Sequence, residues 1–154
     1  MSTLENQTIR VTKTFSFDMA HALFGYDGPC KNIHGHTYSL SITLKGNVNQ
    51  NSNHPKHGMV IDFSDFKKIV MDNIISVYDH TLVLNKNSPH AKISGLSENF
   101  ERIMYVPFQP SCENLMLEFL ALIKLKFPSE ITICKLKLEE TPTSYSEWVL
   151  EDNF

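Results

Sequence analysis

The sequence is most informative at Ile9-Arg-Val-Thr-Lys-Thr-Phe-Ser-Phe-Asp-Met-Ala-His21. Four of its side chains recur at every second position, and they are Phe15, Phe17, Met19 and His21. This period is typical of a β-strand and places all four on one face. Residues 37–45 alternate in the same way. We therefore expect an antiparallel hairpin whose two strands are joined by a long loop, residues 22–33.

The middle of the chain has the pattern of a helix. Residues 58–63 predict a short strand before this helix, and Ser64 is a plausible N-cap of the helix. The apolar positions that follow have the spacing of a helix face, and they are Phe66, Ile69, Val70, Ile74, Val77 and Tyr78. Asp79 and His80 come just past the expected end. A polar loop, residues 85–101, then leads to an apolar run at residues 103–106.

The last third of the chain predicts one helix and two strands. Ser111 is the candidate N-cap of the helix, and Pro128 is expected to end it. Residues 131–141 alternate as a strand, with Glu140 continuing the inward row of Leu136 and Leu138. Residues 144–150 form the final strand. The resulting order is β-β-α-α-β-β, which predicts an α+β fold: an antiparallel sheet with two helices on one face.

Length and composition restrict the possible classes of protein. The chain has 154 residues, which predicts a single domain over residues 1–154. Hydrophobic residues make up 42% and the net charge is −3, which argues against nucleic acid as a partner. Three cysteines, Cys30, Cys112 and Cys134, are few and widely spread, so we expect free thiols in the cytoplasm. We expect neither a secretory leader nor a membrane partner.

Three histidines are expected to converge at one end of the sheet. His34 and His36 are two positions apart and share a face of their strand, while His21 ends the strand before it. Three imidazoles with an open fourth position are typical of catalytic zinc. The alternative is that they are ordinary histidines near a strand end.

Cys30 and the Asp79-His80 pair are candidates for proton transfer. Cys30 lies in a loop rich in glycine and proline, where a thiol beside a cation would have a lowered pKa. Its alternatives are the fourth ligand of a closed structural zinc site or an inert buried thiol. Asp79-His80 is either a surface pair or, if it reaches Cys30, part of a thiol–imidazole–carboxylate relay. Glu140 is either paired or recognises a ligand.

These residues together resemble the 6-pyruvoyl-tetrahydropterin synthase family. The motifs run in order along nearly the whole chain: Phe15-Ser-Phe-Asp-Met-Ala-His21, Cys30-Lys-Asn-Ile-His34-Gly-His36-Thr-Tyr38, Gly58-Met-Val-Ile-Asp-Phe63, Tyr78-Asp-His80, Pro110-Ser-Cys-Glu-Asn114 and Leu138-Glu-Glu-Thr-Pro-Thr-Ser-Tyr145. The gap between Cys30 and His34 is similar to that of the bacterial 6-carboxy-tetrahydropterin synthase branch of queuosine biosynthesis.

The resemblance implies a tunnelling fold (T-fold) that assembles into trimers and a homohexamer, with active sites between subunits. It implies a zinc lyase that converts 7,8-dihydroneopterin triphosphate to 6-carboxy-5,6,7,8-tetrahydropterin, acetaldehyde and triphosphate. It also implies a role for each of ten residues: zinc ligands His21, His34 and His36; catalytic residues Cys30, Asp79 and His80; substrate-binding residues Glu140, Ser111, Cys112 and Glu113.

The chain departs from the family pattern near the expected triphosphate site. Ala22 and Pro29 stand where members often have basic residues, and residues 86–102 form a longer loop than in compact members. Two further functions remain open. The same chemistry could stop at 6-pyruvoyl-tetrahydropterin, without cleavage of the side chain. The chain could also be a non-catalytic module stabilised by zinc.

Overall fold

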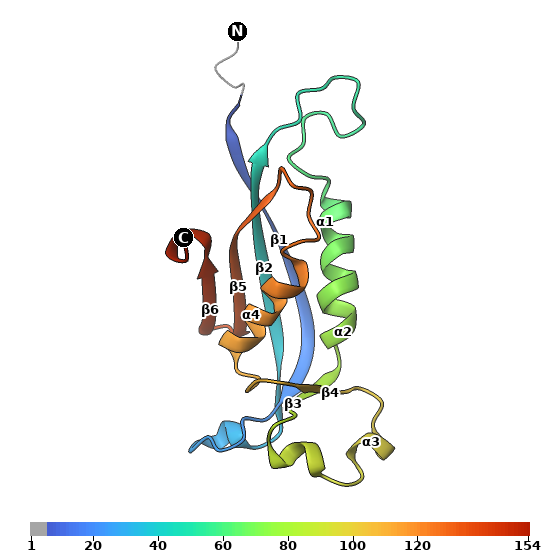
Figure 1. Cartoon of the computed structure of the whole chain (residues 1–154), viewed down its shortest axis with the longest axis vertical. Helices are drawn as coiled ribbons and strands as arrows, with labels where there is room; N and C mark the ends of the chain where they lie inside the picture. The colour runs from blue at the N-terminus through green and yellow to red at the C-terminus, as the bar shows by residue number, and fades with distance from the viewer. Residues whose placement is uncertain (1–5) are drawn as a thin grey trace.

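The architecture is a six-stranded mixed sheet covered on one face by helices (Figure 1). The structure is a computed structural model, and it describes residues 6–154. The strands are β1 (Thr8–His21), β2 (His34–Asn47), β3 (Thr81–Asn85), β4 (Ile103–Val106), β5 (Thr132–Thr141) and β6 (Ser144–Val149). Their order across the sheet is β4-β3-β1-β2-β5-β6.

The expected hairpin is present and forms the centre of the sheet. β1 and β2 pair antiparallel along their whole length, from Thr8 opposite Asn47 to His21 opposite His34. The alternating pattern identifies the buried face of the hairpin correctly. Phe17 and Tyr38, which are opposite each other on that face, are both buried. The other face is polar, where the Thr12 and Thr43 hydroxyls lie 2.8 Å apart.

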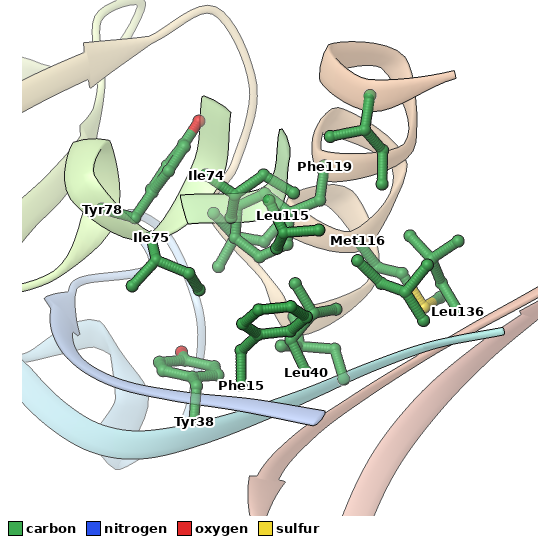
Figure 2. Close-up of a cluster of buried hydrophobic side chains, with 14 of the residues drawn as sticks. Phe15, Tyr38, Leu40, Ile74, Ile75, Tyr78, Leu115, Met116, Phe119 and Leu136 are labelled. Atoms are coloured by element: carbon green, nitrogen blue, oxygen red, sulfur yellow. The ribbon is translucent and has the colours of Figure 1, made fainter. Parts of the chain in front are cut away.

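Two helical segments cover the buried face. The first runs from α1 (Phe63–Val70) through a π-helical turn, η2 (Met71–Ile75), to α2 (Ser76–Tyr78), and the second is α4 (Cys112–Ile123). Figure 2 shows the cluster where they meet the strands, with these side chains labelled: Phe15, Tyr38, Leu40, Ile74, Ile75, Tyr78, Leu115, Met116, Phe119 and Leu136. Burial of such side chains contributes about 1.5–3 kcal/mol each and holds the helices on the sheet.

The predicted fold class is confirmed, but the sheet has two strands more than expected. β3 and β4 extend the sheet beyond β1, and both new pairings are parallel. The β4 residues are the predicted apolar run, whereas β3 was not predicted. Each has only four or five residues, too few for a clear alternating pattern. The polar segment between them contains η3 (Pro89–Lys92) and α3 (Leu96–Asn99).

Three local predictions were wrong. Residues 58–63 do not form a strand. The first helix begins at Phe63 rather than after Ser64, because the Asp62 carboxylate accepts a hydrogen bond of 2.7 Å from the Ser64 amide and caps the helix. Pro128 does not end the second helix, which stops at Ile123. Within residues 6–154, none of the helices combines the length and apolar character needed to cross a membrane.

Candidate active site

The three predicted histidines meet at the end of the β1–β2 hairpin. His21 is the last residue of β1 and His34 is the first residue of β2, and the two are opposite each other in the ladder. His36 is on the same face of β2 as His34. Glu140, near the end of β5, completes a group of four whose ligand atoms all lie within 4.8 Å of one another.

The ring nitrogens of His21 and His34 are oriented by backbone carbonyls. His21 Nδ1 lies 2.6 Å from the Pro110 carbonyl oxygen, and His34 Nδ1 lies 2.7 Å from that of Asn32. A carbonyl can only accept, so both Nδ1 atoms carry the proton and both Nε2 atoms carry a lone pair when the rings are neutral. The two Nε2 atoms are 3.0 Å apart. This arrangement suits a cation between them, and the carbonyls are typical partners of metal-binding imidazoles.

His36 and Glu140 are the other two members of this group. The buried His36 Nε2 lies 2.9 Å from Glu140 Oε1, but the geometry of this contact is not that of a hydrogen bond. Burial lowers the pKa of both His21 and His36, which favours the neutral imidazole that binds metal. The residues therefore fit a divalent metal such as zinc, with three nitrogen donors and a carboxylate beside them.

Asp79 and His80 belong to a second cluster, which includes Asp18 of β1. His80 Nδ1 lies 3.0 Å from Asp79 Oδ1, and the same oxygen accepts a hydrogen bond of 2.9 Å from the Asp18 amide. Asp18 is opposite Thr37, whose hydroxyl donates to the Asp18 carboxylate. The bond from the Asp18 amide is the largest cause of the lowered pKa of Asp79. This carboxylate is thus held ionised beside the imidazole.

A groove of about 910 Å³ opens beside this second cluster. It is lined by Asp18 and His80 and by Phe100 and Arg102 from the segment between β3 and β4. The Phe100 side chain is 63% exposed. The groove gives a small molecule or another chain access to the exposed imidazole of His80.

Comparisons with known proteins identify the family. The family model described as 6-pyruvoyl tetrahydropterin synthase matches residues 10–150. The chain belongs to this family. The predicted resemblance is therefore confirmed over nearly the whole sequence.

Several relatives of this synthase family carry the name of the 6-carboxy branch. A "6-carboxy-5,6,7,8-tetrahydropterin synthase" of Haemophilus influenzae is 38% identical over 141 residues, covering 90% of this chain and 97% of that protein. One of Rickettsia typhi with the same name is 32% identical, with coverage of 90% and 99%. Both matches extend over almost the full length of the relatives.

Solved structures of the family share the fold. The 6-pyruvoyl tetrahydropterin synthase of Plasmodium falciparum matches with a TM-score of 0.69 at 22% identity, covering 93% of this chain and 98% of that chain. The Caenorhabditis elegans protein of that name matches with a TM-score of 0.64 at 24% identity, with coverage of 93% and 96%. These likenesses agree with the predicted T-fold.

The remaining predicted site residues lie around the two clusters. Cys30 is a half-buried free thiol in a short 3-10 turn, η1 (Pro29–Lys31), and does not belong to the group of His21, His34, His36 and Glu140. Ser111 caps α4, its hydroxyl accepting from the Asn114 amide at 3.3 Å. Cys112 is buried with its Sγ 3.3 Å from the Leu138 carbonyl oxygen, and burial raises its pKa. Glu113 is exposed in the first turn of α4.

Sequence reasoning missed four contributors to these clusters: the Pro110 carbonyl, the Asn32 carbonyl, Asp18 and Arg102. Asp18 could have been found, because the predicted hairpin register places it three residues before His21 and opposite Thr37, the neighbour of His36. The two carbonyls gave no signal, since any residue supplies one. Arg102 gave none either, because its contacts depend on how the segment after β3 folds back.

Proposed function

We propose that the chain is a zinc-dependent 6-carboxy-5,6,7,8-tetrahydropterin synthase, a lyase that acts in the cytoplasm. The reaction takes 7,8-dihydroneopterin triphosphate and water to 6-carboxy-5,6,7,8-tetrahydropterin, acetaldehyde and triphosphate. The names of the relatives from Haemophilus influenzae and Rickettsia typhi support the product. Three free cysteines agree with a reducing compartment.

The observation that carries this proposal is the orientation of His21 and His34 by two backbone carbonyls. Their Nε2 atoms lie in one group with Nε2 of His36, which is 2.9 Å from Glu140 Oε1, and this suits the three histidines to hold zinc. Zinc bound there would supply a Lewis acid that polarises oxygen atoms of the substrate side chain. The protein supplies the rigid end of a hairpin, which fixes all three donors before any ligand binds.

Glu140 and the start of α4 are proposed to bind the pterin ring. A carboxylate can accept two parallel N–H bonds from a ring of this kind. Glu140 lies at the edge of the histidine group with its side chain 22% exposed, so it remains accessible. Ser111, Cys112 and Glu113 lie immediately after Pro110, whose carbonyl contacts His21, and this continuity supports their assignment to the same site.

Cys30, Asp79 and His80 are proposed to move protons. Asp79 orients the His80 ring through its Nδ1, which leaves Nε2 free to exchange a proton. The His80 imidazole is exposed and belongs to a group separate from the three histidines, so we propose that the pair serves the histidine site of a neighbouring subunit. Cys30 in the loop before His34 would then meet His80 across the interface.

Unpaired strand edges support such an assembly. β3 pairs with β1 only from Met19 to His21, so within the described chain the remainder of that edge, residues 8–18, has no strand beside it. β6 is the last strand on the other side of the sheet. Edges of this length are commonly covered by another chain. We propose that they join subunits into a trimer, and that two trimers form a hexamer.

Product analysis tests the proposal. Purified protein loaded with zinc is incubated with 7,8-dihydroneopterin triphosphate, and acetaldehyde and pterin products are quantified. Acetaldehyde in equal amount to 6-carboxy-tetrahydropterin is the expected result. Release of triphosphate with a retained three-carbon side chain would instead identify the 6-pyruvoyl reaction. The Cys30→Ala variant separates both from a structural zinc module: it should keep zinc and fold but lose turnover, whereas loss of zinc and unfolding would support the module.

A further inference from the structure

Arg102 is the residue whose contacts the proposed function leaves unexplained. It comes from the long segment between β3 and β4, for which the sequence offered no role. The guanidinium donates three hydrogen bonds, and all of them go to backbone carbonyls at the end of the first helical segment. Nε bonds to the Asp79 carbonyl at 2.9 Å, and one terminal nitrogen bonds to those of Ser76 and Val77 at 2.9 and 3.0 Å.

These carbonyls belong to the turn that presents His80. A helix leaves its last carbonyls without partners within the helix, and cations near that end are favourable. Arg102 satisfies carbonyls at the end of α2 and one residue beyond it, at Asp79. Thr81, the residue after His80, adds a further bond, its hydroxyl donating to the Val77 carbonyl at 3.0 Å. The chain is therefore fixed on both sides of His80.

His80 needs this support because its backbone is strained. Its φ is 57°, in the left-handed region that non-glycine residues seldom adopt. Such a conformation persists only where the surroundings enforce it. The His80 amide donates to the Asp18 carbonyl at 2.6 Å, and the Asp18 amide donates to the Asp79 carboxylate at 2.9 Å. Strand β1 thus holds the His80 amide and the Asp79 carboxylate, while Arg102 holds the Asp79 carbonyl.

The position of Arg102 is itself fixed by the sheet. Its carbonyl accepts a hydrogen bond of 2.9 Å from the Leu82 amide, and β4 begins at the next residue. The parallel pairing of β3 with β4 brings the guanidinium to the helix end, 23 residues after Asp79 in the sequence. The pairing of β3 with β1 and β4, which the sequence did not predict, therefore positions the Arg102 side chain.

We propose that Arg102 is a positioning residue that holds Asp79 and His80 in the geometry needed for proton transfer. The proposal rests on the proposed function, since it assigns Arg102 to the proton-transfer step of that reaction. Arg102 acts through the backbone, so it orients the catalytic pair without contacting the metal group. The long segment between β3 and β4 then has a role in catalysis, because it delivers this side chain.

Steady-state kinetics on three variants of the zinc-loaded protein test this. Arg102→Ala should lower kcat roughly 10- to 100-fold, because a misplacement of about 1 Å can cost about 100-fold. KM and zinc content should stay within about twofold, since all three hydrogen bonds of the guanidinium go to backbone carbonyls. Arg102→Lys should be intermediate because one ammonium cannot reproduce the planar fork. Added guanidinium at millimolar concentration should partly rescue Arg102→Ala. Lys92→Ala, which removes an exposed cation from the same segment, is the matched control and should behave as wild type.

Backbone amide exchange gives a readout that does not depend on activity. The His80 amide should exchange faster in Arg102→Ala than in wild type or Lys92→Ala, because its bond to Asp18 is no longer supported. Exchange at an unchanged rate would overturn the proposal. So would a rise in KM with unchanged kcat, which would indicate substrate contact, or a loss of zinc. If wild type has no turnover, the proposed function fails, and the exchange rates still decide whether Arg102 holds the turn.

Discussion

The Nε2 atoms of His21 and His34 face each other at 3.0 Å, and each ring is held at its other nitrogen by a backbone carbonyl. Two lone pairs at this distance repel unless a proton or a metal cation lies between them. Because the rings are at the end of a long antiparallel ladder, they cannot easily separate. The free protein therefore presents both Nε2 atoms to one metal ion before that ion binds.

Metal binding should stabilise the protein measurably. Zinc at 100 times its dissociation constant would add about 2.7 kcal/mol to the free energy of unfolding. For a chain of this size, that raises Tm by roughly 5–10 °C. The measurement is thermal unfolding of chelator-treated protein before and after zinc is added. His34→Ala should abolish most of the shift, while His57→Ala, on an exposed loop, should preserve it. An equal shift in both variants would argue against the histidine site.

The metal-free protein should lose stability as the pH falls below about 6.5, the ordinary pKa of histidine. Burial holds the pKa of His21 and His36 below that value in the folded state. As the pH falls, the unfolded chain therefore takes up protons at these histidines before the folded protein does. The free energy of unfolding is highest above about pH 6.5 and decreases as the pH falls toward the pKa values of the folded state.

Urea unfolding of chelator-treated protein at several pH values between about 7.5 and 5 measures this loss. The decrease should be smaller in His21→Gln, which removes one of the titrating rings. A free energy of unfolding that stays constant through this range in the wild type would contradict the prediction.

The predictable part of the fold is the part with long-range periodicity. The alternating residues of β1 and β2 are sufficient to predict the hairpin, and the hairpin register brings His21 next to His34. Glu140 was also placed on the correct face, since it continues the row of Leu136 and Leu138. In each case the position of a side chain follows from a period of two along a strand.

The unpredicted parts depend on contacts between distant segments. β3 and β4 are short and pair in parallel, so their partners come from elsewhere in the chain. The second cluster depends on Asp18 of β1 meeting Asp79 at a helix exit, a separation of 61 residues. Periodicity indicates which face a residue occupies, but it does not indicate which turn folds against that face.

Gly35→Ala should weaken metal binding by moving the two histidine-bearing strands apart. A Cβ at this position would meet the Met19 carbonyl oxygen at 3.2 Å, and this backbone atom cannot rotate away. Overpacking of this kind costs about 1–3 kcal/mol. We expect a lower Tm and a larger zinc dissociation constant, measured by competition with a chelator. Ser39→Ala, on the same face of β2, is the control and should leave zinc affinity unchanged. Wild-type affinity in Gly35→Ala would show that the ladder can adjust.

Phe119→Ala should be strongly destabilising because this ring joins both helical segments to the sheet. It is fully buried, and its centroid lies 4.9 Å from that of Tyr78 and 6.0 Å from that of Phe17. Loss of a buried phenylalanine costs about 3–5 kcal/mol through lost burial and the cavity left behind. Urea unfolding should show this loss with an unchanged slope against denaturant, since the same surface is exposed. Leu117→Ala, on the exposed side of the same helix, should change stability by less than about 1 kcal/mol. A similar cost at both positions would mean that α4 is held by its own helical stability rather than by this contact.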